Sequence, residues 1–411
     1  MPLNPHSANL ARYAEKIVVA AECLKRGNLA AADILCRDAI DTNGHAAEPW
    51  LLLGKIAVEL RLFEKAQRYF SEARSRGLEH AGLSTAAAMQ HPSHSRAPKN
   101  QRFILLSAWG AGFWSDVSHI LGGLVLAEIT GRTPIVYWGD ASRYAIPGRD
   151  AWRCYFEPIP PDTEPPNLTA LSRPESPSTG HGPSYISRDD DLIAPECFLS
   201  VAEIAPWIPE SHVLAGLSVE DILRYAAQKY LRPQHDIISQ ARSFFDRHLA
   251  GQRYVAVHVR GTDKAAEFVP RVSTEEFISI VTRRAFEIVD ELDPRFNIFL
   301  LTEDRRIKAA AEHRYPGRVI TTPALRMDGE IAPHFSNSDD RHRLGTEVMI
   351  DVLLALRADA FVGFGGSNVS AMISLLRNWA AGHCALIGPV LLFRRSAFLY
   401  LPEELRHLAI A

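Results

Sequence analysis

The sequence has few cysteines, no long apolar run and almost no excess of charge of either sign. Its five cysteines are Cys23, Cys36, Cys154, Cys197 and Cys384. None of them forms a CxxC pair, which favours a reducing compartment and excludes a zinc framework built on paired cysteines. No stretch approaches 18 uncharged apolar residues, so we expect no membrane span. Lys plus Arg total 45 and Asp plus Glu total 48, a near-balance that argues against nucleic acid or an anionic membrane as the main partner.

Other signatures are also missing. The first residues carry no apolar stretch ahead of the first charges, so we expect no secretion signal and a cytoplasmic protein. There is no GxSxG elbow, HExxH motif, EF-hand loop or kinase set. The chain has 411 residues, which at roughly 150 residues per domain predicts two or three domains. Its 47% hydrophobic and 23% charged residues exclude wholesale disorder.

Residues 1–80 are predicted to be a helical segment with a repeat of 34 residues. Trp50, Gly54 and Phe70 fall at signature positions of tetratricopeptide repeats, where small residues let two helices approach and large ones fill the gap to the next pair. A weaker copy precedes them. Two repeats are fewer than the roughly three that stand alone. We therefore expect this segment to be either a surface for a protein partner or for self-association, or a buttress that packs against the rest of the chain. A linker is predicted at 81–100.

From residue 101 onward, short apolar runs alternate with amphipathic stretches, which predicts parallel sheets with crossover helices. A first α/β lobe is predicted at 101–250, with a proline-rich insertion at 158–195 that is either a functional or a mobile loop. A second α/β lobe is predicted at 251–411. The predicted strands are 103–109, 134–139, 254–260, 296–304, 318–322, 360–368 and 383–388. The predicted helices are 117–129, 219–248 with a break at 232–233, 274–291 and 343–358.

Polar residues collect at the predicted strand ends, where α/β proteins bind ligands. Arg260 closes an apolar strand, and a planar, permanently charged group there suits either a phosphate or an ion pair with the adjacent loop. Asp263 follows, where its carboxylate can orient Arg260 or Lys264. Glu267 lies just beyond and is a candidate base. Glu303 and Asp304 end the next strand, where they either bind hydroxyls or a metal, or cap a helix.

Two glycine-rich turns lead from strands into helices. Such turns expose backbone N–H groups at a helix N-terminus, which suits a phosphate. In the turn at 363–368, Ser367 is either a helix cap or a phosphate donor; in the turn at 110–116, Asp116 is either a cap or a ligand contact. Asp351 interrupts an apolar helical stretch, and a buried carboxylate needs a ligand N–H or a nearby arginine. His119 is expected to be a satisfied core or loop histidine.

Taken together, these segments resemble the alpha-1,6-fucosyltransferases and, more distantly, the protein O-fucosyltransferases. The resemblance spans about 102–390 and leaves the helical prefix outside. It is carried by YLRPQ at 230–234, VAVHVRGTDK at 255–264, FLLTED at 299–304, MIDVLLALRADAFVGFGGSNVS at 349–370 and, more loosely, by 112–138.

The resemblance implies a GT-B-like glycosyltransferase with two Rossmann-like lobes, the first on the acceptor side and the second on the nucleotide-sugar side. It implies a GDP-fucose donor, a glycan or protein acceptor, no metal and inversion at the sugar carbon. By position, Arg260 matches an arginine that grips the β-phosphate. His258 and Asp351 match guanine contacts, and Ser367, in its turn with Gly366 and Asn368, matches a phosphate contact. Gly112 and Asp116 belong to the looser match.

The match continues through Asp263 and Lys264, a pair near the reaction centre, and through Glu303 and Asp304, where the family has two aspartates. Gly261 departs from the family, which has a second arginine there. Glu267 stands one residue before the family's glutamate base, with Asp263 as the alternative.

Inverting transfer needs a base on the acceptor hydroxyl and neutralised charge on the departing diphosphate. Arg260, Lys264 and the 363–368 turn supply the cations and amides, and Glu267 the base. We therefore expect metal-independent transfer of a sugar, with fucose the first choice. The alternatives are transfer from another nucleotide sugar, or an interaction protein with impaired catalysis.

Overall fold

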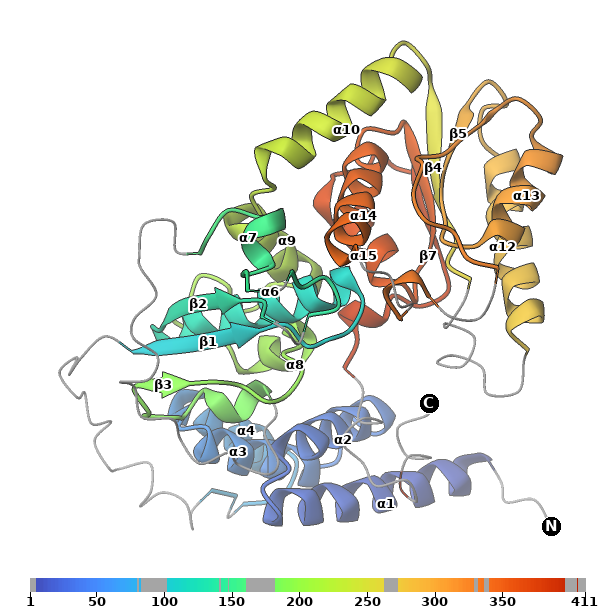
Figure 1. Ribbon diagram of the computed structural model, residues 1–411. Helices are drawn as coiled ribbons and strands as arrows, with labels where there is room; N and C mark the ends of the chain where they lie inside the picture. The colour runs from blue at the N-terminus through green and yellow to red at the C-terminus, as the bar shows by residue number, and fades with distance from the viewer. Residues whose placement is uncertain are drawn as a thin grey trace.

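The computed structural model describes residues 5–79, 81–82, 102–139, 142–146, 148–159, 182–261, 273–328, 332–335, 340–395 and 405. Over these residues the chain forms a helical prefix followed by two α/β lobes, each with a parallel sheet (Figure 1). The expected fold class, two Rossmann-like α/β lobes after an all-α segment, is confirmed. Among the described helices, none is both long enough and apolar enough to cross a membrane.

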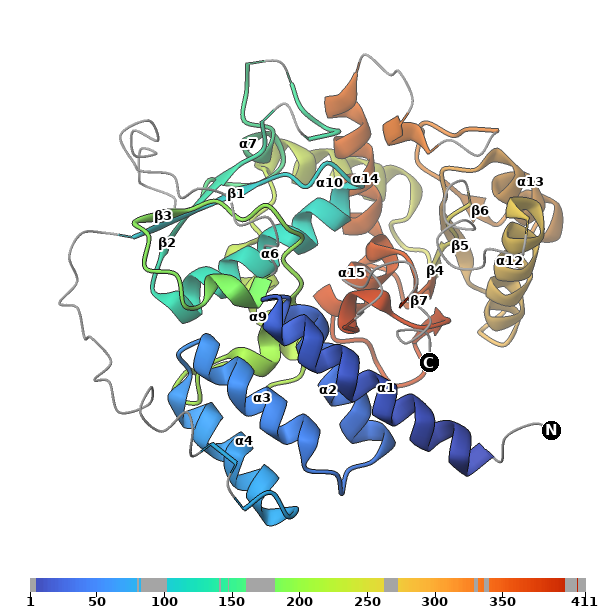
Figure 2. The ribbon, with the colours of Figure 1, turned by 90° about the horizontal axis from the view of Figure 1, so that it is seen from below.

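The prefix consists of two helical hairpins, α1 (Pro5–Lys25) with α2 (Leu29–Thr42) and α3 (Glu48–Glu59) with α4 (Phe63–Ser75) (Figure 2). Gly54 lets the second hairpin close, because a Cβ at this position would lie 2.4 Å from Cε1 of Phe70. The expected paired helices are therefore present. Their identity as tetratricopeptide repeats stays a prediction.

The prefix packs against the first lobe through Trp207, at the end of the short helix η4 (Ala205–Trp207). Trp207 is fully buried within the apolar cluster of the prefix. Its ring meets Tyr69 of α4 edge-on at 6.1 Å, and the guanidinium of Arg37 on α2 lies 5.4 Å from its centroid. These contacts favour the buttress over a free docking surface.

The first lobe has a three-stranded parallel sheet in the order β2-β1-β3. Its strands are β1 (Phe103–Ser107), β2 (Thr133–Tyr137) and β3 (Leu192–Ile193). Helix α6 (Phe113–Thr130) connects β1 to β2 and ends, as predicted, at Gly131, whose φ is +62°. Around this sheet lie α7 (Trp152–Tyr155), η3 (Gly182–Tyr185) and α8 (Val201–Ile204).

Strand β3 corrects one prediction, because it lies in the insertion at 158–195 that was expected to be irregular. Leu192 and Ile193 are buried and pair in parallel with the start of β1. A strand of two residues is too short to produce a periodic pattern in the sequence. Residues 160–181 of this insertion lie outside the described residues.

Helix α9 (Val219–Tyr230) is followed after a short break by α10 (His235–His248), which confirms the predicted interruption at 232–233. Proline at position 233 accounts for this break, since it disfavours the helical conformation in the residue before it. Helix α10 leads from the first lobe to the start of the second sheet and contacts α14 there (Figure 1).

The second lobe has a five-stranded parallel sheet in the order β6-β5-β4-β7-β8. Its strands are β4 (Tyr254–His258), β5 (Asn297–Leu301), β6 (Val319–Ile320), β7 (Ala360–Phe364) and β8 (Cys384–Ile387). Its helices are α12 (Thr274–Asp290), α13 (Arg305–Arg314), α14 (Arg341–Ala355) and α15 (Asn368–Leu376), and η6 (Leu391–Phe393) follows β8. The predicted strands are all present, with shorter ends.

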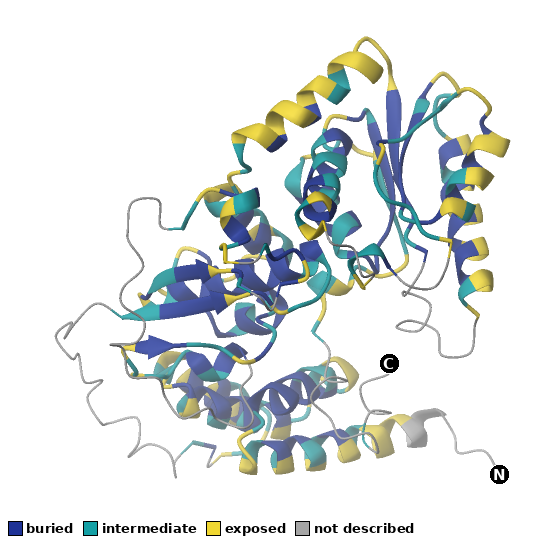
Figure 3. Cartoon of the chain, viewed as in Figure 1, coloured by how far each residue is buried: buried dark blue, intermediate teal, exposed yellow. Residues whose placement is uncertain are grey.

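Both faces of this sheet are covered. Val255 and Val257 pack with α12 and α13, whereas Tyr254 and Ala256 pack on the side of α14 and α15. Figure 3 shows the buried strands between helices whose outer faces are exposed. Because side chains alternate along a strand, His258 and Arg260 continue the row that faces α14 and α15.

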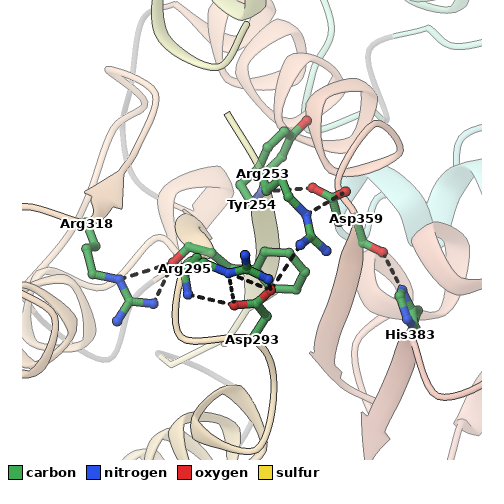
Figure 4. Close-up of polar contacts among 8 residues, drawn as sticks. Arg253, Tyr254, Asp293, Arg295, Arg318, Asp359 and His383 are labelled. Atoms are coloured by element: carbon green, nitrogen blue, oxygen red, sulfur yellow. Dashed lines mark hydrogen bonds and ion pairs between the residues drawn. The ribbon is translucent and has the colours of Figure 1, made fainter. Parts of the chain in front are cut away.

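The amino edge of the second sheet is closed by ion pairs and hydrogen bonds (Figure 4). Asp359, just before β7, accepts a hydrogen bond from the backbone N–H of Tyr254 at 2.9 Å. Asp293 pairs with Arg295 at 2.6 Å and with Arg253 at 3.0 Å. The polar groups of this edge are thus used within the chain, so a ligand site is expected at the opposite edge.

The docking of the prefix can be tested with Trp207→Ala. The substitution removes a fully buried indole from the boundary between the prefix and the first lobe, and we expect it to lower the free energy of unfolding by about 3–5 kcal/mol. Chemical denaturation measures this loss. Val213→Ala, at a side chain 74% exposed, is the control and should change stability by less than about 0.5 kcal/mol. Equal stabilities of the two variants would contradict the packing.

Candidate functional site

The strand order of the second sheet defines where a ligand fits. Taking β4 as the first strand, the order β6-β5-β4-β7-β8 is 3-2-1-4-5, so the chain reverses direction across the sheet between β4 and β7. Ligands of open α/β sheets bind at the carboxyl ends of the strands on either side of such a switch point. Arg260 follows β4 and Ser367 follows β7, so two predicted site residues lie at this position.

Arg260 is held from both lobes. Its Nε lies 3.7 Å from Oε1 of Glu303, and the same carboxylate oxygen accepts a hydrogen bond of 3.2 Å from the backbone N–H of Gly261. On the other side it faces the first lobe, since a Cβ on Gly112 would lie 3.8 Å from Nη1 of Arg260. The arginine side chain is 15% exposed. The structure therefore brings Arg260, Glu303 and Gly112 together, and their contact with a substrate stays a prediction.

The N-terminus of α15 lies at the same edge of the sheet, because β7, the neighbour of β4, leads into it. Ser367 is its N-cap residue and is 1% exposed, yet its Oγ has no hydrogen-bond partner among the described residues. A helix N-terminus attracts anions, and a buried hydroxyl without a partner needs one. Gly366 belongs to the turn before Ser367, and Asn368 is the first residue of the helix.

His258 connects β4 to this helix. Its Nδ1 lies 2.6 Å from Oγ of Ser370 in the first turn of α15. Burial, and then the charge of Arg260, lower its pKa to about 3, so the imidazole is neutral. Since Nδ1 is engaged by Ser370, His258 positions the helix. Its expected contact with guanine stays a prediction.

Asp351 on α14 forms a second polar group with the loop after β6. Oγ1 of Thr322 donates a 2.7 Å hydrogen bond to its Oδ1, and burial raises its pKa to about 7. Arg326 donates from Nη1 to the carbonyl oxygens of Thr322 and Ala324, both at 3.0 Å. The Nε and Nη2 of Arg326 are buried without a partner in the described part of the chain. Arg326 was not among the predicted site residues, because a loop arginine outside any motif gives no signal.

Asp304 corrects the prediction of a substrate contact. Its side chain is fully buried and caps α13, accepting a hydrogen bond of 2.8 Å from the backbone N–H of Arg306. It also pairs with the guanidinium of Arg306 at 2.6 Å. A carboxylate occupied in this way offers no surface to a ligand. It also explains Gly261, because a Cβ there would lie 2.5 Å from Oδ2 of Asp304.

Asp116 holds the glycine turn that faces Arg260. It is fully buried on α6, and its Oδ1 accepts a hydrogen bond of 3.1 Å from the backbone N–H of Ala111. Burial raises its pKa to about 7. Its Oδ2 is buried without a partner among the described residues, and its expected ligand contact stays a prediction.

His119 confirms its prediction as a satisfied histidine. It is 3% exposed and accepts a hydrogen bond of 2.9 Å at Nδ1 from the backbone N–H of Leu199. Three further predicted residues, Asp263, Lys264 and Glu267, lie outside the described residues. Their catalytic roles stay predictions.

Comparisons with known proteins give structural likenesses alone. No protein-family model and no curated protein matches the chain. Similar solved structures include NodZ alpha-1,6-fucosyltransferase co-crystallised with GDP, which is 16% identical to this chain, with a TM-score of 0.44. The match covers 67% of this chain and 93% of that chain, and a fucosyltransferase NodZ from Bradyrhizobium is also among the similar structures. POFUT1 in complex with GDP is 16% identical over 70% and 98%, with a TM-score of 0.42. A mutant of FUT1 from Arabidopsis thaliana in complex with GDP is 10% identical over 83% and 79%, with a TM-score of 0.47. With TM-scores below 0.5, these likenesses assign no activity to this chain.

The environment of Asp351 predicts a pH effect on stability. Its pKa is raised from the usual 3.8 to about 7, so the stability that its protonated form contributes is present below about pH 4 and is lost as the pH rises through 7. Asp351→Asn keeps the acceptor for Thr322 but cannot ionise. We expect equal stabilities at low pH and a variant more stable by about 4 kcal/mol at pH 8, measured by urea denaturation. Asp328→Asn, at an exposed side chain, is the control. Parallel stability curves for wild type and Asp351→Asn would contradict the raised pKa.

Proposed function

We propose that this chain is a glycosyltransferase that takes a sugar from a GDP-sugar and transfers it to a glycan or protein acceptor. Fucose is the sugar favoured by the resemblance of its motifs. One observation carries the proposal: at the switch point of the second sheet, β4 leads to Arg260 and its neighbour β7 leads to the N-terminus of α15, whose buried Ser367 hydroxyl has no partner among the described residues.

The chemistry of sugar transfer fits these groups. When the bond from sugar to phosphate breaks, negative charge develops on the leaving diphosphate, and donors already in place stabilise it most effectively. A guanidinium grips phosphate oxygens through two parallel N–H bonds, while the amides at the start of α15 add a favourable dipole. With the guanidinium and these amides to neutralise the leaving diphosphate, the proposed transfer requires no metal.

The polar group around Asp351 supports guanine as the base. Guanine presents neighbouring N–H donors at one edge and the acceptors O6 and N7 at another. The carboxylate of Asp351 accepts from such donors, and the buried Nε and Nη2 of Arg326 have hydrogen atoms to offer such acceptors. Uracil lacks this combination, so the same group disfavours a UDP-sugar.

The acceptor is expected between the lobes, because Arg260 of the second lobe faces Gly112 of the first. Inverting transfer needs a base that removes the proton of the acceptor hydroxyl. Glu267 is the proposed base and Asp263 the alternative, with Lys264 as a further cation near the reaction centre. These assignments rest on the sequence motif.

One feature favours the alternative of an interaction protein with impaired catalysis. Gly261 supplies no cation beside Arg260, and Asp304 fills the space next to it. Nucleotide binding is common to an active and an impaired enzyme, so transfer itself has to be measured.

The choice of donor can be tested by thermal shift with GDP and UDP. A ligand that binds only the folded state at 100 times its Kd stabilises it by about 2.7 kcal/mol. We expect GDP to raise the Tm and UDP to leave it nearly unchanged, because Asp351 and Arg326 match guanine. Stabilisation by UDP alone, or by neither nucleotide, would contradict the proposal.

The phosphate role of Arg260 can be tested with Arg260→Ala. Loss of one contact made in the transition state costs about 3 kcal/mol, so we expect donor hydrolysis or transfer from GDP-fucose to fall at least about a hundredfold. The control is Arg295→Ala, at an arginine 80% exposed on the opposite edge of the same sheet (Figure 4), which should keep the rate. An unchanged rate for Arg260→Ala would rule out its contact with the leaving group.

A further inference from the structure

A histidine that no motif indicated lies opposite the glycine turn of the first lobe. His334 belongs to η5 (Pro333–Phe335) of the second lobe. A Cβ on Gly112 would lie 3.8 Å from Nε2 and from Cε1 of His334, and equally 3.8 Å from Nη1 of Arg260. The imidazole and the guanidinium therefore face the same small space in front of Gly112, although they come from different segments of the chain.

Neighbouring aromatic rings hold the imidazole in place. Its centroid lies 4.3 Å from the ring of Phe335 and 6.3 Å from the ring of Tyr144 in the first lobe. The guanidinium of Arg143 lies 4.9 Å from the centroid of Phe335, and its Nε donates a 3.0 Å hydrogen bond to the carbonyl oxygen of Gly110. This chain of contacts connects η5, and with it His334, to the glycine turn of the first lobe.

The charge of a nucleoside diphosphate exceeds what Arg260 neutralises. Such a group carries between two and three negative charges near neutral pH, because the last ionisation of its terminal phosphate has a pKa of about 6. Arg260 carries one positive charge and shares it with Glu303 at 3.7 Å. A second group that becomes positive in the same space would improve binding, and a protonated imidazole donates a charge-assisted hydrogen bond to phosphate.

We propose that His334 is a phosphate-binding residue of the donor site, whose imidazole takes up a proton when the diphosphate arrives. The inference rests on the proposed function and names a further residue of the same site. In the empty site, the charge of Arg260 disfavours a second cation nearby; in the occupied site, the phosphates reverse this preference.

Among the described residues, charged groups of both signs belong to the elements near His334. The guanidinium of Arg143 lies over the ring of Phe335, Asp116 bonds the glycine turn, and Glu303 pairs with Arg260. Helix α14, which contacts η5, begins at Arg341 with Asp340 as its N-cap residue. These groups belong to the protein with and without nucleotide, whereas the phosphates arrive with the ligand and change the charge that faces the imidazole.

The test is calorimetric titration of GDP into the full chain and into His334→Gln, near pH 6 and near pH 8.5. One charge-assisted hydrogen bond to phosphate corresponds to about a tenfold change in Kd. We expect His334→Gln to bind GDP about tenfold more weakly near pH 6 and within about twofold of wild type near pH 8.5. Titrations in buffers with different ionisation heats should also show that wild type takes up a proton on binding and that the variant takes up less.

Two variants separate this role from a structural one. His334→Arg carries a fixed charge, so it should bind GDP tightly at both pH values and lose the difference in proton uptake. His383→Gln is the matched control at the opposite edge of the second sheet, where Nδ1 of His383 lies 2.9 Å from the carbonyl oxygen of Asp359 (Figure 4). It should behave as wild type.

Equal GDP binding by wild type and His334→Gln at both pH values would overturn the inference. A loss of the same size at both pH values would overturn it as well, since it would reveal a packing role without a proton. In both cases GDP still binds, so the proposed function survives. Failure of wild type to bind GDP would instead contradict the proposed function and the inference together.

Discussion

The guanidinium of Arg260 is the point on which the arrangement of the site depends. It extends from the end of a buried strand, is oriented by Glu303, and reaches the glycine turn at the start of α6 in the other lobe. A cation in this position is kept from full hydration, since its side chain is 15% exposed. An anionic ligand at this edge would interact with it and would connect the two lobes.

The polar groups at the two edges of the second sheet differ in whether they have hydrogen-bond partners among the described residues. At the amino edge, Asp293 and Asp359 are paired with arginines and backbone N–H groups, and the network is complete within the chain. At the carboxyl edge, the hydroxyl of Ser367 and two nitrogen atoms of Arg326 are buried without partners in the described residues. Each such group costs about 1–3 kcal/mol of stability. A ligand that bonds these groups would offset this cost, which is why this edge is the better candidate for the site.

The sequence allowed the strands and helices to be predicted well, because apolar periodicity and glycine or proline signals act locally. It placed Arg260 and Ser367 at a common edge, because the carboxyl ends of parallel strands meet there. It misassigned Asp304, because a carboxylate near a turn gives the same pattern whether it bonds backbone N–H groups or a ligand. It missed β3, Arg326 and His334, whose positions are set by tertiary packing of short segments without a motif.

Binding of guanosine diphosphate at the carboxyl ends of β4 and β7 can be seen directly in a crystal structure of the protein with GDP. We expect phosphate oxygens within hydrogen-bond distance of the Arg260 guanidinium and the Ser367 hydroxyl, and the N–H edge of guanine in contact with the carboxylate of Asp351. A GDP molecule bound elsewhere, with Arg260 paired only to Glu303 and the Ser367 hydroxyl bonded to the protein itself, would contradict it.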